Sequence, residues 1–97
     1  MRLSFDGEIW YWRGPAPFHF VIVPDEEGEE LHTVSVIVSY GWGVIPVTAE
    51  IGETNWATSL IPKDGTYLLP VKAAVRDVEG LDVGDRVRVN LTVDLGT

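Results

Sequence analysis

The sequence contains no cysteine, and this absence excludes several kinds of chemistry at once. Disulfide bonds, thiolate metal centres and a cysteine nucleophile cannot occur. The fold must therefore be held by an apolar core alone. A chain of 97 residues is long enough for one core, because a domain of this size buries roughly 60–65% of the surface of its unfolded chain. We expect a single domain over residues 1–97.

Long apolar runs are also missing. No segment comes close to the run of about 18 apolar residues that a membrane-spanning helix requires. The N-terminal residues MRLSFDGE carry charges at short intervals and lack the apolar centre of a secretory signal. These two features predict a cytoplasmic protein without a membrane partner.

Basic residues are scarce. There are 7 Lys and Arg residues against 15 Asp and Glu residues, which gives a formal net charge of −8. Nucleic-acid binding depends on cations that neutralise phosphates, so nucleic acid and anionic membranes are not expected partners. The acidic excess indicates either a well-solvated surface or a preference for a cationic partner or ligand.

The common metal and catalytic motifs are absent too. The two histidines, His19 and His32, do not lie at the spacing of a zinc-binding helix, and Ser59 lacks a nucleophile elbow. The acidic run PDEEGEE over residues 24–30 lacks the ligand spacing of a calcium loop. It suits the first turn of a helix, with Asp25 as the N-cap. We therefore expect no metal and no cofactor.

Alternating apolar and polar residues dominate what is present. In residues 3–12 the alternation places Leu3, Phe5 and Ile9 on one face of a strand, with Trp10 and Trp12 on the other. Residues 18–23 are apolar on both faces, as in a strand inside a closed barrel or under a covering element. Further strands are predicted over residues 44–51, 56–61, 66–69 and 86–93.

Two short helices are predicted between the strands. The first begins at Glu26 and ends at Val38, and the second begins at Val71 and ends at Glu79. Pro70 suits the first turn of the second helix and Gly80 its C-terminal cap. A stripe at helical spacing is expected to plug the barrel; it consists of Val71, Ala74, Val75 and Val78.

The predicted fold class is mainly β, a small closed barrel of about six strands capped by two short helices. Closure is favoured because it removes exposed strand edges. The order strand, proline, helix, strand occurs twice, around Pro24 and around Pro70, which indicates an internal duplication. A chain that holds both units is expected to fold as a monomer.

Two resemblances support this fold. Residues 67–89 resemble the strand–helix–GD–strand unit of AbrB-like regulators, at the level of fold alone. The whole chain resembles a bacterial family, domain of unknown function 1905, through its segments VIVP (21–24), GWGVIPV (41–47), WATSLIP (56–62), GTYLLPVKAAVR (65–76) and GD (84–85). The family resemblance implies a double-split β-barrel capped by helices, with no established activity.

Aromatic residues provide the candidate site. Trp10 and Trp12 share the face of a strand where polar residues are expected, and Trp42 lies between two glycines. Arg13 could supply a charged rim, and His19 a polar group from the next strand. We take these five residues as candidate ligand-binding residues, with no catalytic residue assigned. The alternative is that the tryptophans only seal the core beneath the helices.

Three functions remain open. The leading one is a small non-enzymatic binding module that takes a small ligand or peptide in an aromatic-rimmed cleft. The second is an accessory protein that binds another polypeptide through an exposed patch. The third is an enzyme that uses His19. Exposed tryptophans around a cavity favour the first, a flat apolar patch the second, and a carboxylate within reach of His19 the third.

Overall fold

The computed structural model describes residues 1–38 and 43–94. The strands are β1 (Arg2–Trp12), β2 (Phe18–Ile22), β3 (Ile45–Ile51), β4 (Thr54–Lys63), β5 (Thr66–Pro70) and β6 (Arg86–Thr92). The helices are α1 (Asp25–Val38) and α2 (Ala73–Glu79). This composition confirms the mainly β class.

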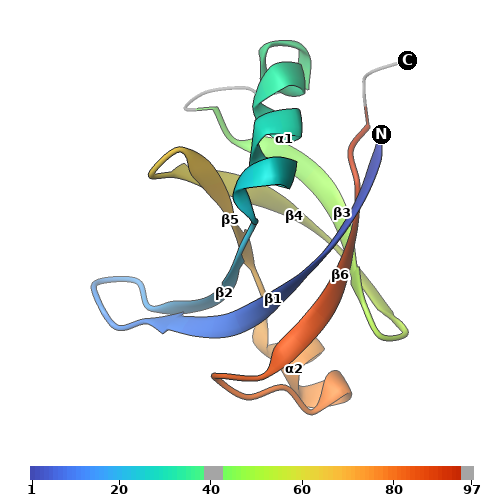
Figure 1. The fold of residues 1–97 in the computed structure, drawn as a ribbon. Helices are drawn as coiled ribbons and strands as arrows, with labels where there is room; N and C mark the ends of the chain where they lie inside the picture. The colour runs from blue at the N-terminus through green and yellow to red at the C-terminus, as the bar shows by residue number, and fades with distance from the viewer. Residues whose placement is uncertain (39–42, 95–97) are drawn as a thin grey trace.

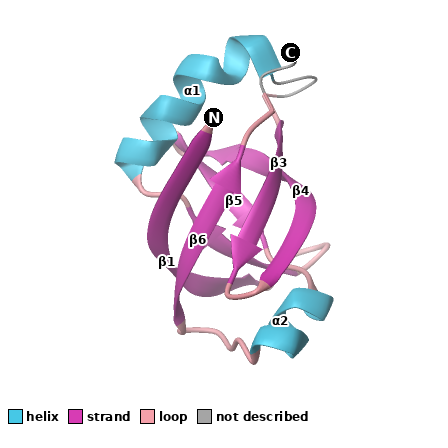
Figure 2. Cartoon of the chain, turned by 90° about the vertical axis from the view of Figure 1, so that its right-hand side faces the viewer, coloured by secondary structure: helices cyan, strands magenta, loops and turns pink. Residues whose placement is uncertain are grey.

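The six strands form a closed barrel in the order β1-β2-β5-β4-β3-β6, and every neighbouring pair is antiparallel. The two helices lie at opposite ends of the barrel, α1 at the top and α2 at the bottom of Figures 1 and 2. The predicted barrel with two helical caps is therefore confirmed. Among the described residues, neither helix is long and apolar enough to cross a membrane.

The strand order confirms the internal duplication. The first half of the chain runs β1, β2, α1, β3, and the second half runs β4, β5, α2, β6. Exchanging the corresponding strands of the two halves leaves every pairing in the barrel unchanged, so the topology has a pseudo-twofold relation. The two halves meet at four strand pairs, β2–β5, β3–β4, β3–β6 and β1–β6, and in the first of these Val21 lies opposite Leu69.

The core fills the interior of the barrel. Alternate residues of each strand point inward, and Ile9, Val21, Leu60 and Leu69 are completely buried. Each helix adds a buried residue from its end of the barrel, Leu31 from α1 and Val75 from α2. Burial of these apolar side chains is the main stabilising contribution to the fold.

Helix α1 begins one residue earlier than predicted, at Asp25. The amide of Gly28 donates a hydrogen bond to the carbonyl of Pro24 at 2.8 Å, which closes the first helical turn at Pro24. Asp25 therefore lies inside the first turn, and its assignment as the N-cap is wrong. With Glu26 and Glu27 it still places negative charge at the positive end of the helix dipole.

Helix α2 begins two residues later than predicted, at Ala73. Pro70 is the last residue of β5, and the amide of Val71 still donates to the carbonyl of His19 at 2.9 Å. The sheet ladder therefore competes with the helix for these residues and holds them in the strand. Gly80 adopts the left-handed conformation at φ 64°, which confirms it as the cap.

The predicted stripe on α2 is only half right. Val71 and Val75 are buried, whereas Ala74 is exposed and Val78 is 74% exposed. The helix has only 7 residues, so a single side chain, Val75, reaches the barrel interior. Val71 is buried from the end of β5, and Ala74 and Val78 face solvent.

Candidate functional site

An apolar groove lies on the outer surface of the barrel, across β1, β2, β5 and β4. Its volume is about 450 Å³, within the range of roughly 300–1,000 Å³ that is typical of small-molecule sites. The groove is lined by Trp12, Phe18, Phe20, Ile22, Ile61, Lys63, Asp64 and Leu68. All but Lys63 and Asp64 are apolar, so the groove offers mainly carbon atoms to a ligand.

The alternation of the strands explains why these side chains point outward. On β1, Ile9 is buried in the core, and its neighbour Trp10 is 47% exposed. Trp12 lies on the same outer face and is 49% exposed. On β2, Val21 is completely buried and Ile22 is exposed. At the C-terminal end of β1 and along β2, the outward positions, normally polar in a soluble barrel, are thus large and apolar.

The strand register joins the outward side chains into one surface. Trp12 of β1 lies directly opposite Phe18 of β2. Leu68 of β5 lies opposite Ile22 on one side and opposite Ile61 of β4 on the other. The rings of Phe18 and Phe20 are 5.4 Å apart between centroids and tilted by 45°. The groove wall is therefore aromatic on the β1–β2 hairpin and aliphatic on β4 and β5.

The polar end of the groove is the turn between β4 and β5. Asp64 and Gly65 adopt positive φ angles of 48° and 85°, as the Asp-Gly pair predicts for a tight turn. The β1–β2 loop and this turn project to the same side of the barrel, on the left in Figure 1. Lys63 and Asp64 therefore close one end of the groove with a charge of each sign.

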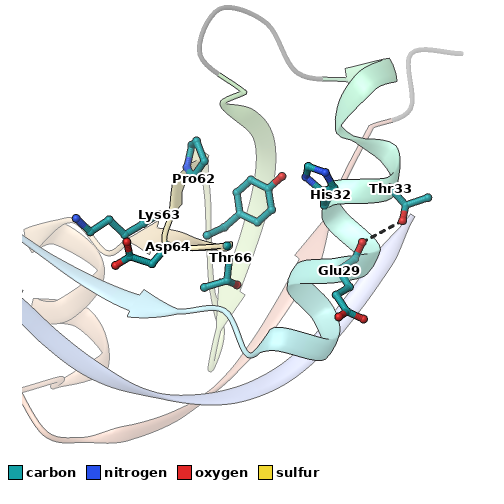
Figure 3. Close-up of a pocket in the computed structure, with 9 residues that line it drawn as sticks. Glu29, His32, Thr33, Pro62, Lys63, Asp64 and Thr66 are labelled. Carbon is teal, nitrogen blue, oxygen red and sulfur yellow. Dashed lines mark hydrogen bonds between the residues drawn. The ribbon is translucent and has the colours of Figure 1, made fainter.

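A second, more polar cavity of about 640 Å³ lies on the other side of the same turn, against α1. It is lined by Glu29, His32, Thr33, Pro62, Lys63, Asp64, Gly65, Thr66 and Tyr67. Figure 3 shows Glu29, His32 and Thr33 on the helix and Pro62, Lys63, Asp64 and Thr66 at the end of the hairpin, with His32 pointing toward the hairpin.

The hydroxyl groups of this second cavity are engaged by the protein itself. Thr33 Oγ1 donates to the carbonyl of Glu29 at 3.0 Å, and Thr66 Oγ1 donates to the carbonyl of Val23 at 2.7 Å. Within residues 1–38 and 43–94, the side chains of Glu29, Lys63 and Asp64 form no hydrogen bond or ion pair. The cavity is wide and open, and its mixed charges do not select one class of ligand.

The structure separates the five candidate residues predicted from the sequence. Trp12 lines the groove, and Trp10 lies on the same outer face, opposite Phe20. Because both tryptophans are about half exposed, core packing does not explain them. Trp42 lies outside the described residues. Arg13 and His19 lie away from the groove, at the inner side of the β1–β2 hairpin.

Arg13 and His19 belong to a separate cluster around Tyr11. The rings of Tyr11 and His19 are 4.6 Å apart between centroids, and the Arg13 guanidinium lies 5.7 Å from the Tyr11 ring. Burial of the imidazole, and then the positive charge of Arg76, hold the pKa of His19 below its ordinary value of 6.5. The cluster is therefore basic and aromatic, in a chain that is acidic as a whole.

The enzyme hypothesis gains no support from this geometry. Over residues 1–38 and 43–94, no hydrogen bond or ion pair joins the His19 side chain to a carboxylate that could orient it as a general base. The same residues contain no group of three or more His, Asp or Glu side chains arranged to hold a metal ion.

Sequence reasoning missed most of the groove. Residues 18–23 were expected in a strand inside a closed barrel or under a covering element; β2 is a barrel strand, and Phe18, Phe20 and Ile22 line the outer groove. The missed signal was the apolar character of both faces of β2, together with two tryptophans on the outer face of β1. Ile61 and Leu68 could not be assigned to the groove without the pairing of β2 with β5, which is set by the topology.

Comparison with known proteins identifies a family but no individual relative. A search of curated proteins found no match to this chain. The model of one family, described as domain of unknown function DUF1905, matches residues 5–91, which is most of the chain. The barrel and its two helices agree with the fold that the sequence resemblance implied. The chain therefore belongs to the DUF1905 family.

Proposed function

We propose that this domain is a non-enzymatic binding module and that the outer groove takes a small apolar ligand. The observation that supports this most strongly is the gathering of exposed apolar side chains around one cavity. Trp12, Ile22 and Ile61 are between 38% and 49% exposed, and they come from three different strands of the groove. Exposed apolar surface of this kind commonly marks a site of interaction.

The side chains that line the groove are better suited to contact an apolar ligand than to contact water. Its walls are aromatic and aliphatic, so a ligand gains apolar contact on both sides. Lys63 and Asp64 at one end offer a donor and an acceptor that can orient a polar group of the ligand. The barrel interior is closed by its own core, so the groove residues are not required to complete it.

A neutral solvatochromic dye tests this proposal. Nile red is expected to bind the protein and to shift its emission to shorter wavelength as it enters an apolar site. Ile61→Ser removes part of the groove wall at an exposed position, so the variant should fold and bind the dye more weakly, by roughly fivefold or more for the lost apolar contact.

Val78→Ser is the matched control, because Val78 is an exposed valine on α2, outside the groove. It should bind Nile red like the parent protein. Equal loss of binding in Ile61→Ser and Val78→Ser would mean that the dye samples apolar surface in general, and the groove proposal would then be wrong.

A polypeptide partner is the second candidate. Trp10 is 47% exposed and lies on the groove face beyond the cavity itself, so the apolar surface continues past the space a small ligand would fill. We infer that the partner is not nucleic acid, since the net charge of −8 opposes phosphate contacts.

We also propose that the domain is monomeric, because closure of the barrel leaves no described strand with an unpaired edge. Light scattering of the parent protein and of Ile61→Ser measures the oligomeric state of each. A dimer that is lost in Ile61→Ser would instead assign the groove to a second copy of the chain.

A further inference from the structure

Basic side chains converge beside the start of α2 although the chain is acidic. Arg13 lies just beyond the end of β1, His19 is in β2, and Arg76 is in α2. Lys72 immediately precedes α2. Three of the 7 Lys and Arg residues of the sequence, and one of its 2 histidines, therefore belong to one region.

Direct contacts connect this region. The Tyr11 ring is near both partners, with the Arg13 guanidinium 5.7 Å and the His19 ring centroid 4.6 Å from its centroid. The His19 carbonyl accepts the amide of Val71 at 2.9 Å, and the Val71 carbonyl accepts Arg76 Nε at 3.2 Å. Strand pairing and the start of α2 thus connect Arg13, His19 and Arg76 through a chain of contacts.

None of these groups is neutralised by the protein. In the described part of the chain, Arg13, Lys72 and Arg76 form no ion pair, although the sequence has 15 carboxylate side chains. The bond from Arg76 Nε leaves the two terminal nitrogens of its guanidinium without a described acceptor. The His19 ring nitrogens likewise have no described hydrogen-bond partner.

We propose that Arg13, His19 and Arg76 form a binding site for a small oxyanion, a phosphate or a carboxylate group. Guanidinium groups present paired N–H donors that match the oxygens of both anions. A protonated imidazole adds a further charged donor. A long polyanion is not expected, because the net charge of −8 over the whole chain opposes it.

The titration of His19 follows from the same arrangement. Tyr11 and Arg13 on the β1 side and Arg76 on the α2 side are the titratable or charged groups that the described contacts connect to His19. The α2 helix also carries Asp77 and Glu79. Burial and Arg76 depress its pKa below 6.5. A bound oxyanion offsets that positive charge and raises the pKa. By linkage, the anion must then bind more tightly as the pH falls.

NMR titration of the full chain tests the site. The ring protons of His19 and His32 are followed against pH in a cationic buffer at constant ionic strength, in chloride and then in inorganic phosphate. Phosphate is expected to raise the pKa of His19 and to leave that of His32, which lies on α1, unchanged. A second titration with acetate distinguishes a carboxylate site from one that prefers phosphate.

Charge-matched variants locate the site. Arg13→Gln should weaken phosphate binding roughly tenfold, since hydrogen bonds to charged groups contribute about 1.5–3 kcal/mol. Arg2→Gln removes the same charge at the other end of β1 and should change the affinity by less than about twofold, because exposed charges at that distance are screened. Arg76→Gln provides a second variant within the site.

Equal phosphate effects on His19 and His32, or equal losses in Arg13→Gln and Arg2→Gln, would overturn the proposal by showing general screening only. The inference does not depend on the groove. Nile red carries no charge, so its binding tests the groove and not the oxyanion site. Either proposal can therefore be wrong without affecting the other.

Discussion

The two halves of the barrel share one topology and differ on their surfaces. In the first half, β1 and β2 are joined by a loop over residues 13–17, and α1 has 14 residues. In the second half, β4 and β5 are joined by the tight Asp64–Gly65 turn, and α2 has 7 residues. The buried side chains of both halves are almost all apolar, since both halves build the same core.

The outer faces of the two halves carry different side chains, although the two halves share one topology. The first half supplies the aromatic wall of the groove, Trp12, Phe18 and Phe20, and the second half supplies the aliphatic wall, Ile61 and Leu68. The groove extends across the β2–β5 pair, one of the four strand pairs at which the halves meet. Features common to both halves therefore belong to the fold, and features present in one half are candidates for function.

The largest expected effect tests the shared inner face. Val75→Asp places a charge at a position that is 1% exposed beneath α2, and should lower the free energy of unfolding by roughly 3–4 kcal/mol. Val78→Asp introduces the same charge on the exposed face of the same helix and should cost less than about 1 kcal/mol. Chemical denaturation measures both. Similar losses in the two variants would mean that α2 does not pack as described.

A smaller loss of stability is expected from a substitution where α1 packs against β5, a contact that α2 does not reproduce. Helix α1 meets β5 at Gly28, where an added Cβ would overlap the Thr66 side chain, and α2 contains no glycine. Thr66 cannot rotate away without losing its hydrogen bond to Val23. Gly28→Ala should therefore destabilise the protein by about 1–2 kcal/mol.

The neighbouring variant Glu29→Ala is the control, since it changes an exposed residue of the same helix. Helix propensity alone predicts that Gly28→Ala stabilises by roughly 1 kcal/mol. A measured gain of that size would contradict the close contact between α1 and β5.

The smallest effect concerns pH and the α2 end of the barrel. The pKa of His19 is depressed in the folded state, so below 6.5 the unfolded chain binds the proton more readily. The contribution of neutral His19 to stability is complete above 6.5 and is lost as the pH falls through the folded pKa. His19→Gln should reduce the loss of stability between about pH 6.5 and pH 5.

His32→Gln controls for the removal of an imidazole in general. Thermal unfolding of the three proteins at several pH values makes the comparison. If His19→Gln and the parent protein lose stability in parallel over this range, the described surroundings of His19 are wrong.

The fold was largely predictable from the sequence because its signals are local. Alternation along β1, the Asp64–Gly65 turn and the Gly80 cap are each properties of a few neighbouring residues. The start of α2 was not predictable in this way, because a long-range bond from Val71 to the His19 carbonyl keeps that residue in the sheet.

The candidate site was predictable only in part. Trp10 and Trp12 on the polar face of β1 gave a visible signal, since alternation was broken there. Their separation from Arg13 and His19 could not be predicted, because adjacent residues of one strand point to opposite sides of the barrel wall. The partners Ile61 and Leu68 are brought to Ile22 by strand pairing between the two halves.

The indole resonances of the tryptophans test the central claim most directly. Trp12 lies in the groove and is 49% exposed, whereas Trp56 is buried in the barrel at 6% exposure. When Nile red is titrated into isotopically labelled protein, the Trp12 Nε1–H resonance should shift progressively and the Trp56 resonance should stay unchanged. A shift of Trp56 with an unchanged Trp12 would place the apolar ligand inside the barrel and contradict the outer groove as the binding site.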